Sequence, residues 1–192
     1  EKPILEVLLE QFKASGFADF LFAVNHLADR ITAHFGDGSR WGVRIGYLRE
    51  TRPLGTIGAL SLIKGPVREP ILVANGDILT KVDFGALLDF HKAEGAAATL
   101  CVKSHEVHIP YGIVEIDGYR LQSFVEKPTH RTYINAGIYV LEPKALSWLP
   151  RGKHFDMPQL IALIQKRRKN GVGSLPGSLR EAPRGLGELE AL

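Results

Sequence analysis

The chain has 192 residues, of which 45% are apolar and 23% are charged, which is the size and composition of one globular domain. No apolar run approaches the ~18–20 residues of a membrane-spanning helix, so a membrane protein is excluded. The formal net charge is only +3 and the basic residues are scattered, which argues against a nucleic-acid partner. The single cysteine, Cys101, cannot form an internal disulfide, and this favours a cytoplasmic location.

The first hundred residues predict helices and strands in alternation. Apolar residues recur at helical spacing over 4–12, and Gly16 supplies the C-terminal stop of that helix. The pattern then predicts a strand over 20–24, a helical turn over 27–34, a strand over 43–48, a helix over 57–64, a strand buried on both faces over 70–74, a helix over 82–94 and a strand over 97–102. This alternation with short connections indicates an α/β fold with a mixed, mostly parallel sheet.

The pattern changes after residue 110. Three strands are predicted over 112–116, 120–125 and 133–141, and Asp117-Gly118 is typical of a hairpin turn between the first two. Helices are predicted over 143–148 and 156–169. The last segment, 171–192, has five glycines, two prolines and no legible period, so we expect a poorly ordered tail behind one domain over 1–170.

A carboxylate follows directly on the most apolar strand. Asn75-Gly76-Asp77 comes after Ile71-Leu-Val-Ala74, and ligands of open α/β sheets bind outside the carboxyl ends of the strands. Asp77 is also the type of oxygen ligand that Mg²⁺ shares with substrate phosphates. The alternative is that these residues form only a turn that caps the next helix.

Two further groups have the chemistry of a binding site. Gly55 and Gly58 stand at the mouth of a predicted helix, where backbone N–H groups can hold a phosphate or the edge of a nucleobase, although this is also an ordinary helix entry. Glu126 and Lys127 follow a strand and suit sugar hydroxyls and a phosphate, respectively, although a solvated surface pair has the same sequence. Cys101, with no activating partner beside it, is expected to be a buried small hydrophobe.

Taken in order, these segments resemble the sugar-1-phosphate nucleotidyltransferase family. The resemblance covers about residues 1–170 and rests on Lys2-Pro-Ile-Leu5, Phe35-Gly-Asp-Gly-Ser39 with Trp41-Gly42, Pro53-Leu-Gly-Thr-Ile-Gly-Ala59, Asn75-Gly-Asp77, Tyr111-Gly112, Glu126-Lys-Pro128 and Asn135-Ala-Gly-Ile-Tyr139. Members join an NTP to a sugar 1-phosphate and release pyrophosphate. The stretch from Phe35 to Ala59 is most similar to guanylyltransferases that act on mannose 1-phosphate or heptose 1-phosphate.

The resemblance implies a Rossmann-like (GT-A-like) three-layer sandwich and a role for each matching residue. It implies that GTP and a sugar 1-phosphate are the substrates and that Mg²⁺ is the cofactor. The nucleotide is expected at Leu54, Gly55, Thr56 and Gly76, the metal ion at Asp77, and the sugar phosphate at Gly112, Glu126, Lys127, Asn135 and Gly137. Asp77 and Lys127 are the expected catalytic residues.

Two departures from the family pattern change this expectation. The glycine-rich Gly-x-Gly-Thr-Arg loop and its strand, which precede the Lys-Pro pair in the family, are absent before Lys2, and no aspartate follows Asp156 to act as a second metal ligand. We therefore expect an N-terminally truncated domain that lacks the first strand, has impaired activity and can form a homodimer through the open sheet position. The alternative is a non-catalytic homologue that binds an NDP-sugar or a partner chain.

Overall fold

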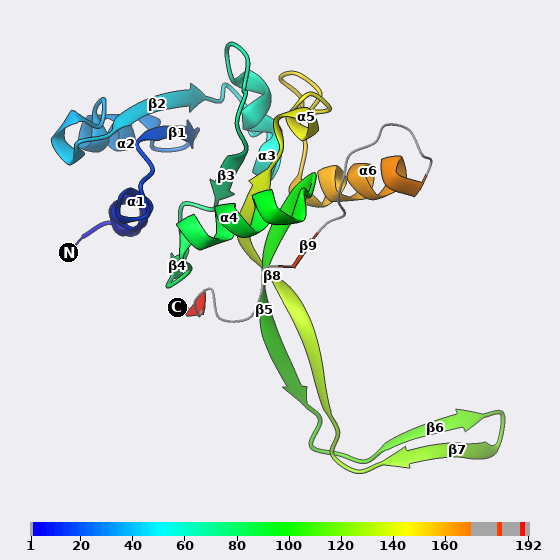
Figure 1. Ribbon diagram of the computed structural model, residues 1–192. Helices are drawn as coiled ribbons and strands as arrows, with labels where there is room; N and C mark the ends of the chain where they lie inside the picture. The colour runs from blue at the N-terminus through cyan, green and yellow to red at the C-terminus, as the bar shows by residue number, and fades with distance from the viewer. Residues whose placement is uncertain (1, 170–179, 182–188, 191–192) are drawn as a thin grey trace.

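The computed structural model describes residues 2–169, 180–181 and 189–190 (Figure 1). The expected alternation is present in the first half, as α1 (Ile4–Ala14), β1 (Asp19–Val24), α2 (Ala28–Phe35), β2 (Arg44–Arg49), α3 (Gly55–Gly58), β3 (Ile71–Ala74), β4 (Leu79–Thr80), α4 (Phe84–Glu94) and β5 (Ala98–His108). The second half contains β6 (Ile113–Asp117), β7 (Arg120–Val125), β8 (Thr129–Leu141), α5 (Pro143–Leu146), α6 (Met157–Lys169), β9 (Arg180–Glu181) and β10 (Leu189–Glu190). Short 3₁₀ turns occupy Ser39–Trp41 and Ala59–Leu62.

A three-layer core is built around β8, which lies between β3 and β5. Its last residues alternate between two apolar clusters because successive side chains of a strand point to opposite faces. Tyr139 and Leu141 pack with residues of α3, α5 and α6, whereas Ile138 and Val140 pack with residues of α1 and α4. Helices therefore cover both faces of this sheet, and the expected α/β class is confirmed.

The share of parallel pairing is smaller than the sequence pattern predicts. β1 and β2 pair in parallel, but β8 is antiparallel to both β3 and β5. The reason is the connection: β5 returns as β8 through the β6–β7 hairpin, and a strand that returns through a hairpin lies antiparallel to the one before it. The pair β5–β8 is the longest ladder of the described chain, so the described sheet is mixed rather than mostly parallel.

The strands of the first half do not join into one sheet. Within the described residues β1 pairs only with β2, and β3 pairs only with β8. Helix α1 bridges the two sheets, because its Leu9 packs in the cluster of β2 while its Leu8 and Phe12 pack in the cluster of β8. All four residues of β3 are only half-buried, not buried on both faces as their sequence predicts, since no strand among the described residues pairs with its second edge.

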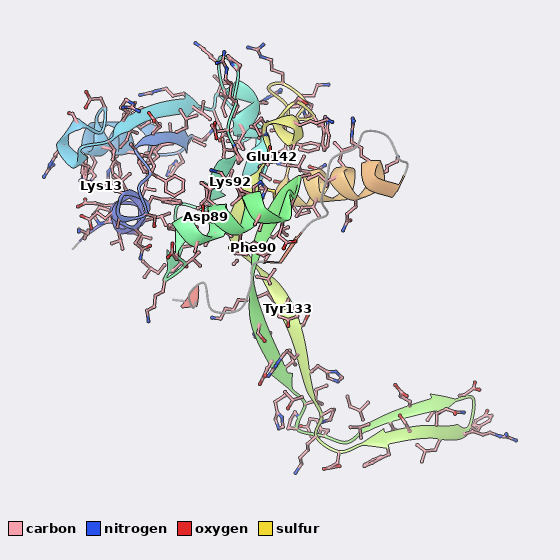
Figure 2. The ribbon with its side chains drawn as sticks, viewed as in Figure 1. Lys13, Asp89, Phe90, Lys92, Tyr133 and Glu142 are labelled. Atoms are coloured by element: carbon pink, nitrogen blue, oxygen red, sulfur yellow. The ribbon has the colours of Figure 1, made fainter. Side chains whose placement is uncertain are left out.

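The outer halves of β5 and β8 leave the core as a two-stranded ribbon with the β6–β7 hairpin at its far end (Figure 1). Figure 2 shows Tyr133 on the upper part of this ribbon, below Asp89 and Phe90 of α4. The hairpin forms as expected around Gly118, whose φ of +60° suits the turn. Its large apolar side chains are exposed, with Ile116 at 69% and Leu121 at 65%.

The expected tail, 171–192, lies outside the described residues except for β9 and β10. There, β9 pairs in parallel with β5, and β10 pairs antiparallel with β4. Among the residues that are described, no helix has the length and apolar character needed to cross a membrane.

Candidate active site

The loop before α3 is shaped by a glycine and a buried anchor. Gly55 has a φ of +78°, a conformation that side chains rarely adopt, and this conformation aims the start of α3. Leu54 is buried, with 3% of its surface exposed, so its side chain is not available to a nucleotide. The Leu54 N–H donates to Oε2 of Glu50 at 2.8 Å. Thr56 remains exposed at the first turn of the helix.

The start of α6, about a hundred residues further along the chain, is hydrogen-bonded to this loop. The Thr56 N–H donates to Oδ1 of Asp156 at 2.9 Å, and the Thr56 hydroxyl lies 3.3 Å from the same oxygen. The Thr56 hydroxyl oxygen in turn accepts from the N–H of Met157 at 2.8 Å. The expected nucleotide loop is thus joined to the first residues of α6.

A second set of contacts runs through the backbone of Phe155. Its N–H donates to the carbonyl of Leu54 at 2.8 Å, and its carbonyl accepts from the N–H groups of Ile57 and Gly58 at 3.1 and 3.0 Å. A Cβ atom on Gly55 would lie 2.8 Å from the Phe155 carbonyl oxygen and 2.6 Å from Oδ1 of Asp156. Glycine is required here because the backbone of 155–156 occupies the space of a side chain.

Two of the expected sugar residues, Asn135 and Gly137, lie against the loop that follows β3 and carries Asp77. The Asn75 N–H donates to the carbonyl of Gly137 at 3.0 Å, and a Cβ atom on Gly137 would lie 2.7 Å from Nδ2 of Asn75. Asn135 fixes this turn, since its Oδ1 accepts from the N–H of Gly137 at 3.1 Å and its Nδ2 donates to the hydroxyl of Tyr139. Gly76 and Asp77 follow Asn75 and are exposed. Two segments sixty residues apart therefore form one surface.

The other expected sugar-phosphate residues, Gly112, Glu126 and Lys127, lie apart from this surface. Gly112, Glu126 and Lys127 lie where the hairpin joins the ribbon, and a Cβ atom on Gly112 would lie 3.0 Å from Oε2 of Glu126 and 2.6 Å from Cζ of Phe124. The Lys127 ammonium lies 3.9 Å from the Glu126 carboxylate, and both side chains are about 60% exposed. Figure 1 shows this part of the chain at the far end of the ribbon from β3. The structure thus brings these three residues together, but not to Asp77.

A cavity of about 530 Å³ lies at the carboxyl ends of the parallel strands β1 and β2. Polar residues that sequence reasoning did not select line it, including Asn25, Arg49 and Glu50. Glu50 connects the cavity with the loop, because it lines the cavity and accepts the N–H of Leu54. The signal that could have found these residues is the rule that ligands bind at the carboxyl ends of parallel strands.

The side chains near Asp77 must also suit the expected Mg²⁺ ion. The described residues contain no cluster of three or more histidine, cysteine, aspartate or glutamate side chains that could hold a metal ion by themselves. Mg²⁺ commonly takes one or two carboxylates together with water and substrate phosphates. A single exposed carboxylate at a strand end, Asp77, fits that mode of binding.

Known proteins are similar to this chain in sequence over most of its length. A family model described as nucleotidyl transferase matches residues 1–166. A UTP–glucose-1-phosphate uridylyltransferase of Synechocystis is 34% identical over 82% of this chain and 45% of its own length. A mannose-1-phosphate guanylyltransferase of Mycobacterium tuberculosis is 35% identical over 83% of this chain and 45% of its own length. The chain thus spans about half the length of these curated relatives.

Solved structures share the fold. HddC from Yersinia pseudotuberculosis superposes with a TM-score of 0.62 at 21% identity over 94% of this chain and 76% of the other. A structure of HddC complexed with GMP-PN gives 0.57 at 25% identity, over 81% of this chain and 69% of the other. A putative glucose-1-phosphate thymidylyltransferase from Bacillus anthracis gives 0.68 at 18% identity over 97% and 76%.

Proposed function

The chain belongs to the nucleotidyl transferase family, and from this premise we propose that it transfers a nucleotidyl group from an NTP to a sugar 1-phosphate. In this reaction a phosphate oxygen of the sugar phosphate attacks the α-phosphorus of the NTP, and pyrophosphate leaves. Such transfers depend on in-line positioning and charge neutralisation more than on a protein nucleophile. The observation that carries the proposal is the contact of Asn75 with Gly137, which Asn135 holds in turn, because it brings expected sugar residues to the loop that carries Asp77, the expected metal ligand.

GTP is the nucleotide that the cavity favours. Glu50 is half-buried and lines the cavity, and its carboxylate can accept further hydrogen bonds besides the one that its Oε2 accepts from the Leu54 N–H. Guanine presents adjacent N–H and NH₂ donors on one edge, which a carboxylate accepts. GTP is also supported by the names of two relatives, a mannose-1-phosphate guanylyltransferase of Mycobacterium tuberculosis and a probable mannose-1-phosphate guanylyltransferase of Arabidopsis thaliana.

Mg²⁺ belongs to the same proposal, with Asp77 as its protein ligand. When bound, the ion would neutralise charge on the nucleotide phosphates. Asp77 would hold the ion beside the turn that Asn75 and Gly137 fix, and Gly76 would let the nucleotide approach the backbone, since a Cβ there would meet only Leu5 at 3.6 Å. Lys127 and Glu126 would hold the phosphate and hydroxyls of the sugar.

We further propose a cytoplasmic homodimer. Support for the location comes from the single buried cysteine, which is typical of a reducing compartment. Support for the dimer comes from β1 and β3, each of which has one strand neighbour within the described residues, since an unpaired edge is a template for another chain. Light scattering after size exclusion should show twice the chain mass, and a monomer at every concentration would contradict the dimer.

A second candidate, NDP-sugar binding without turnover, is favoured by one observation. Lys127 lies at the far end of the ribbon from the segment that carries Asp77, so the sugar phosphate and the metal ion would be held apart in this arrangement (Figure 1). An enzyme of this family would then turn over slowly, since the loss of one preorganised charge-stabilising group typically costs ~10²–10³ in rate.

The experiment that tests the function is pyrophosphate release with Mg²⁺, GTP and mannose 1-phosphate or heptose 1-phosphate, repeated with the other NTPs. We expect slow release that depends on both substrates, far below the ordinary enzyme range of ~1–10³ s⁻¹. Lys127→Ala should weaken binding of the sugar phosphate, whereas Lys103→Ala on the same ribbon should not. Binding of an NDP-sugar with no release would select the second candidate, and neither binding nor release would contradict both.

A further inference from the structure

Helix α3 is too short to define its own conformation. It has only four residues, Gly55–Gly58. The residue at its N-cap position, Leu54, has no side-chain group that accepts a hydrogen bond from the first N–H groups of the helix. In longer helices a capping side chain from the preceding residue performs this task. In α3 the N–H groups of residues 56–58 donate instead to Phe155 and Asp156, which stand just before α6. The loop conformation therefore depends on residues that are remote in sequence.

Asp156 is the side chain that supplies the missing cap. It stands at the start of α6, where an aspartate ordinarily accepts from the first N–H groups of its own helix. Its Oδ1 accepts instead from the N–H and hydroxyl of Thr56. The start of α6 is held in another way, because Gln159 accepts the Asp156 N–H at 2.7 Å through its side chain and donates its own N–H to the Asp156 carbonyl at 3.0 Å.

The same carboxylate also fixes how closely the loop approaches α6. Its Oδ1 lies 2.6 Å from the position of a Cβ on Gly55, so it is packed directly against the glycine that aims the loop. Its other oxygen, Oδ2, lies 3.8 Å from Nδ1 of His154. One charged group therefore contacts both the turn at Gly55 and the Thr56 amide of the expected nucleotide loop.

We propose that Asp156 is a positioning residue for the nucleotide, which it serves by capping α3 and holding the backbone of Leu54–Thr56 toward the ligand. This inference rests on the proposed function. We expect Asp156 to affect binding of the nucleotide and not binding of the sugar phosphate. The expected ligand residues that its carboxylate contacts are Gly55 and Thr56, both in the nucleotide loop.

The test compares Asp156→Ala with a matched loss of an aspartate cap elsewhere. Asp83 caps α4, and its Oδ1 accepts the Ala86 N–H at 2.9 Å, the same distance as in the Thr56 contact. Both alanine variants should lower the melting temperature by a similar amount. Asp156→Asn keeps an acceptor oxygen, so its melting temperature and its affinity for GTP should be close to those of the unchanged protein.

Calorimetric titration of the full chain with GTP and Mg²⁺ gives the first readout. Asp156→Ala should raise the Kd of GTP about tenfold, equivalent to ~1.4 kcal/mol, and leave the Kd of mannose 1-phosphate unchanged. Asp83→Ala should change neither by more than about twofold. Equal effects of the two alanine variants on GTP, or no rescue by Asp156→Asn, would overturn the proposal.

Amide hydrogen exchange separates this proposal from the proposed function. In Asp156→Ala the amides of Thr56, Ile57 and Gly58 should exchange faster than in the unchanged protein, and in Asp83→Ala they should not. If the unchanged protein binds no GTP, the proposed function fails, and the cap still stands on this exchange pattern. Unchanged exchange at Thr56 in Asp156→Ala would overturn the cap itself.

Discussion

Replacing Gly55 by alanine should destabilise the protein by more than its backbone conformation alone explains. An L-residue in the left-handed region costs about 1–2 kcal/mol. The added Cβ would also lie 2.6 Å from Oδ1 of Asp156 and 2.8 Å from the Phe155 carbonyl oxygen, so the loop and the start of α6 must separate. The separation weakens one or two hydrogen bonds, each worth about 1 kcal/mol, which adds roughly 2 kcal/mol to the cost.

Gly152→Ala is the matched control for this experiment. Gly152 also has a positive φ, +63°, but nothing lies within 4 Å of the position that its Cβ would take. Thermal unfolding followed by circular dichroism should therefore show a larger shift for Gly55→Ala. At about 2–4 °C per kcal/mol for a chain of this length, the difference between the two variants should be about 4–8 °C. Equal shifts would refute the packing of 155–156 against the loop.

Three further predictions concern groups outside that loop. Burial raises the pKa of the Cys101 thiol to about 11, so the native protein at pH 8 should resist a thiol reagent that labels it fully in urea, and rapid native labelling would contradict this. Burial lowers the pKa of His91, against the opposing effect of Glu142, so folding favours its neutral form. Stability should be full above the unfolded pKa of about 6.5 and fall as the pH drops below it, a slope that urea titrations should find reduced in His91→Gln. Asp77→Ala should remove the Mg²⁺ dependence of GTP binding measured by calorimetry, and an unchanged dependence would place the ion elsewhere.

Much of the fold could be predicted from periodicity and turn residues. Helix α1, helix α4 and the β6–β7 hairpin lie within a few residues of their predicted positions, because their apolar spacing and their glycine stops are local signals. The meeting of Asn75 with Gly137 was not predicted from the sequence. Local sequence could not supply it, since the contact depends on how β3 pairs with β8.

The rest depends on contacts that no local pattern encodes. Asp156 has the sequence pattern of a cap for α6, and only the fold shows that its carboxylate serves Thr56. The direction of the ribbon that carries Lys127 is likewise invisible in sequence, because its outer residues are exposed on both faces of the ribbon. The half-burial of β3 follows from its having one strand neighbour within the described part of the chain, whereas its four apolar residues predict burial on both sides.

The most direct test of the nucleotide site is hydrogen–deuterium exchange of the full chain with and without saturating GTP and Mg²⁺. Bound nucleotide should slow exchange at two separate places, the loop 54–58 and the turn 75–77, and leave the β6–β7 hairpin unchanged. Protection at both places is the result that this account predicts. Saturating GTP that protects neither the loop nor the turn would contradict it.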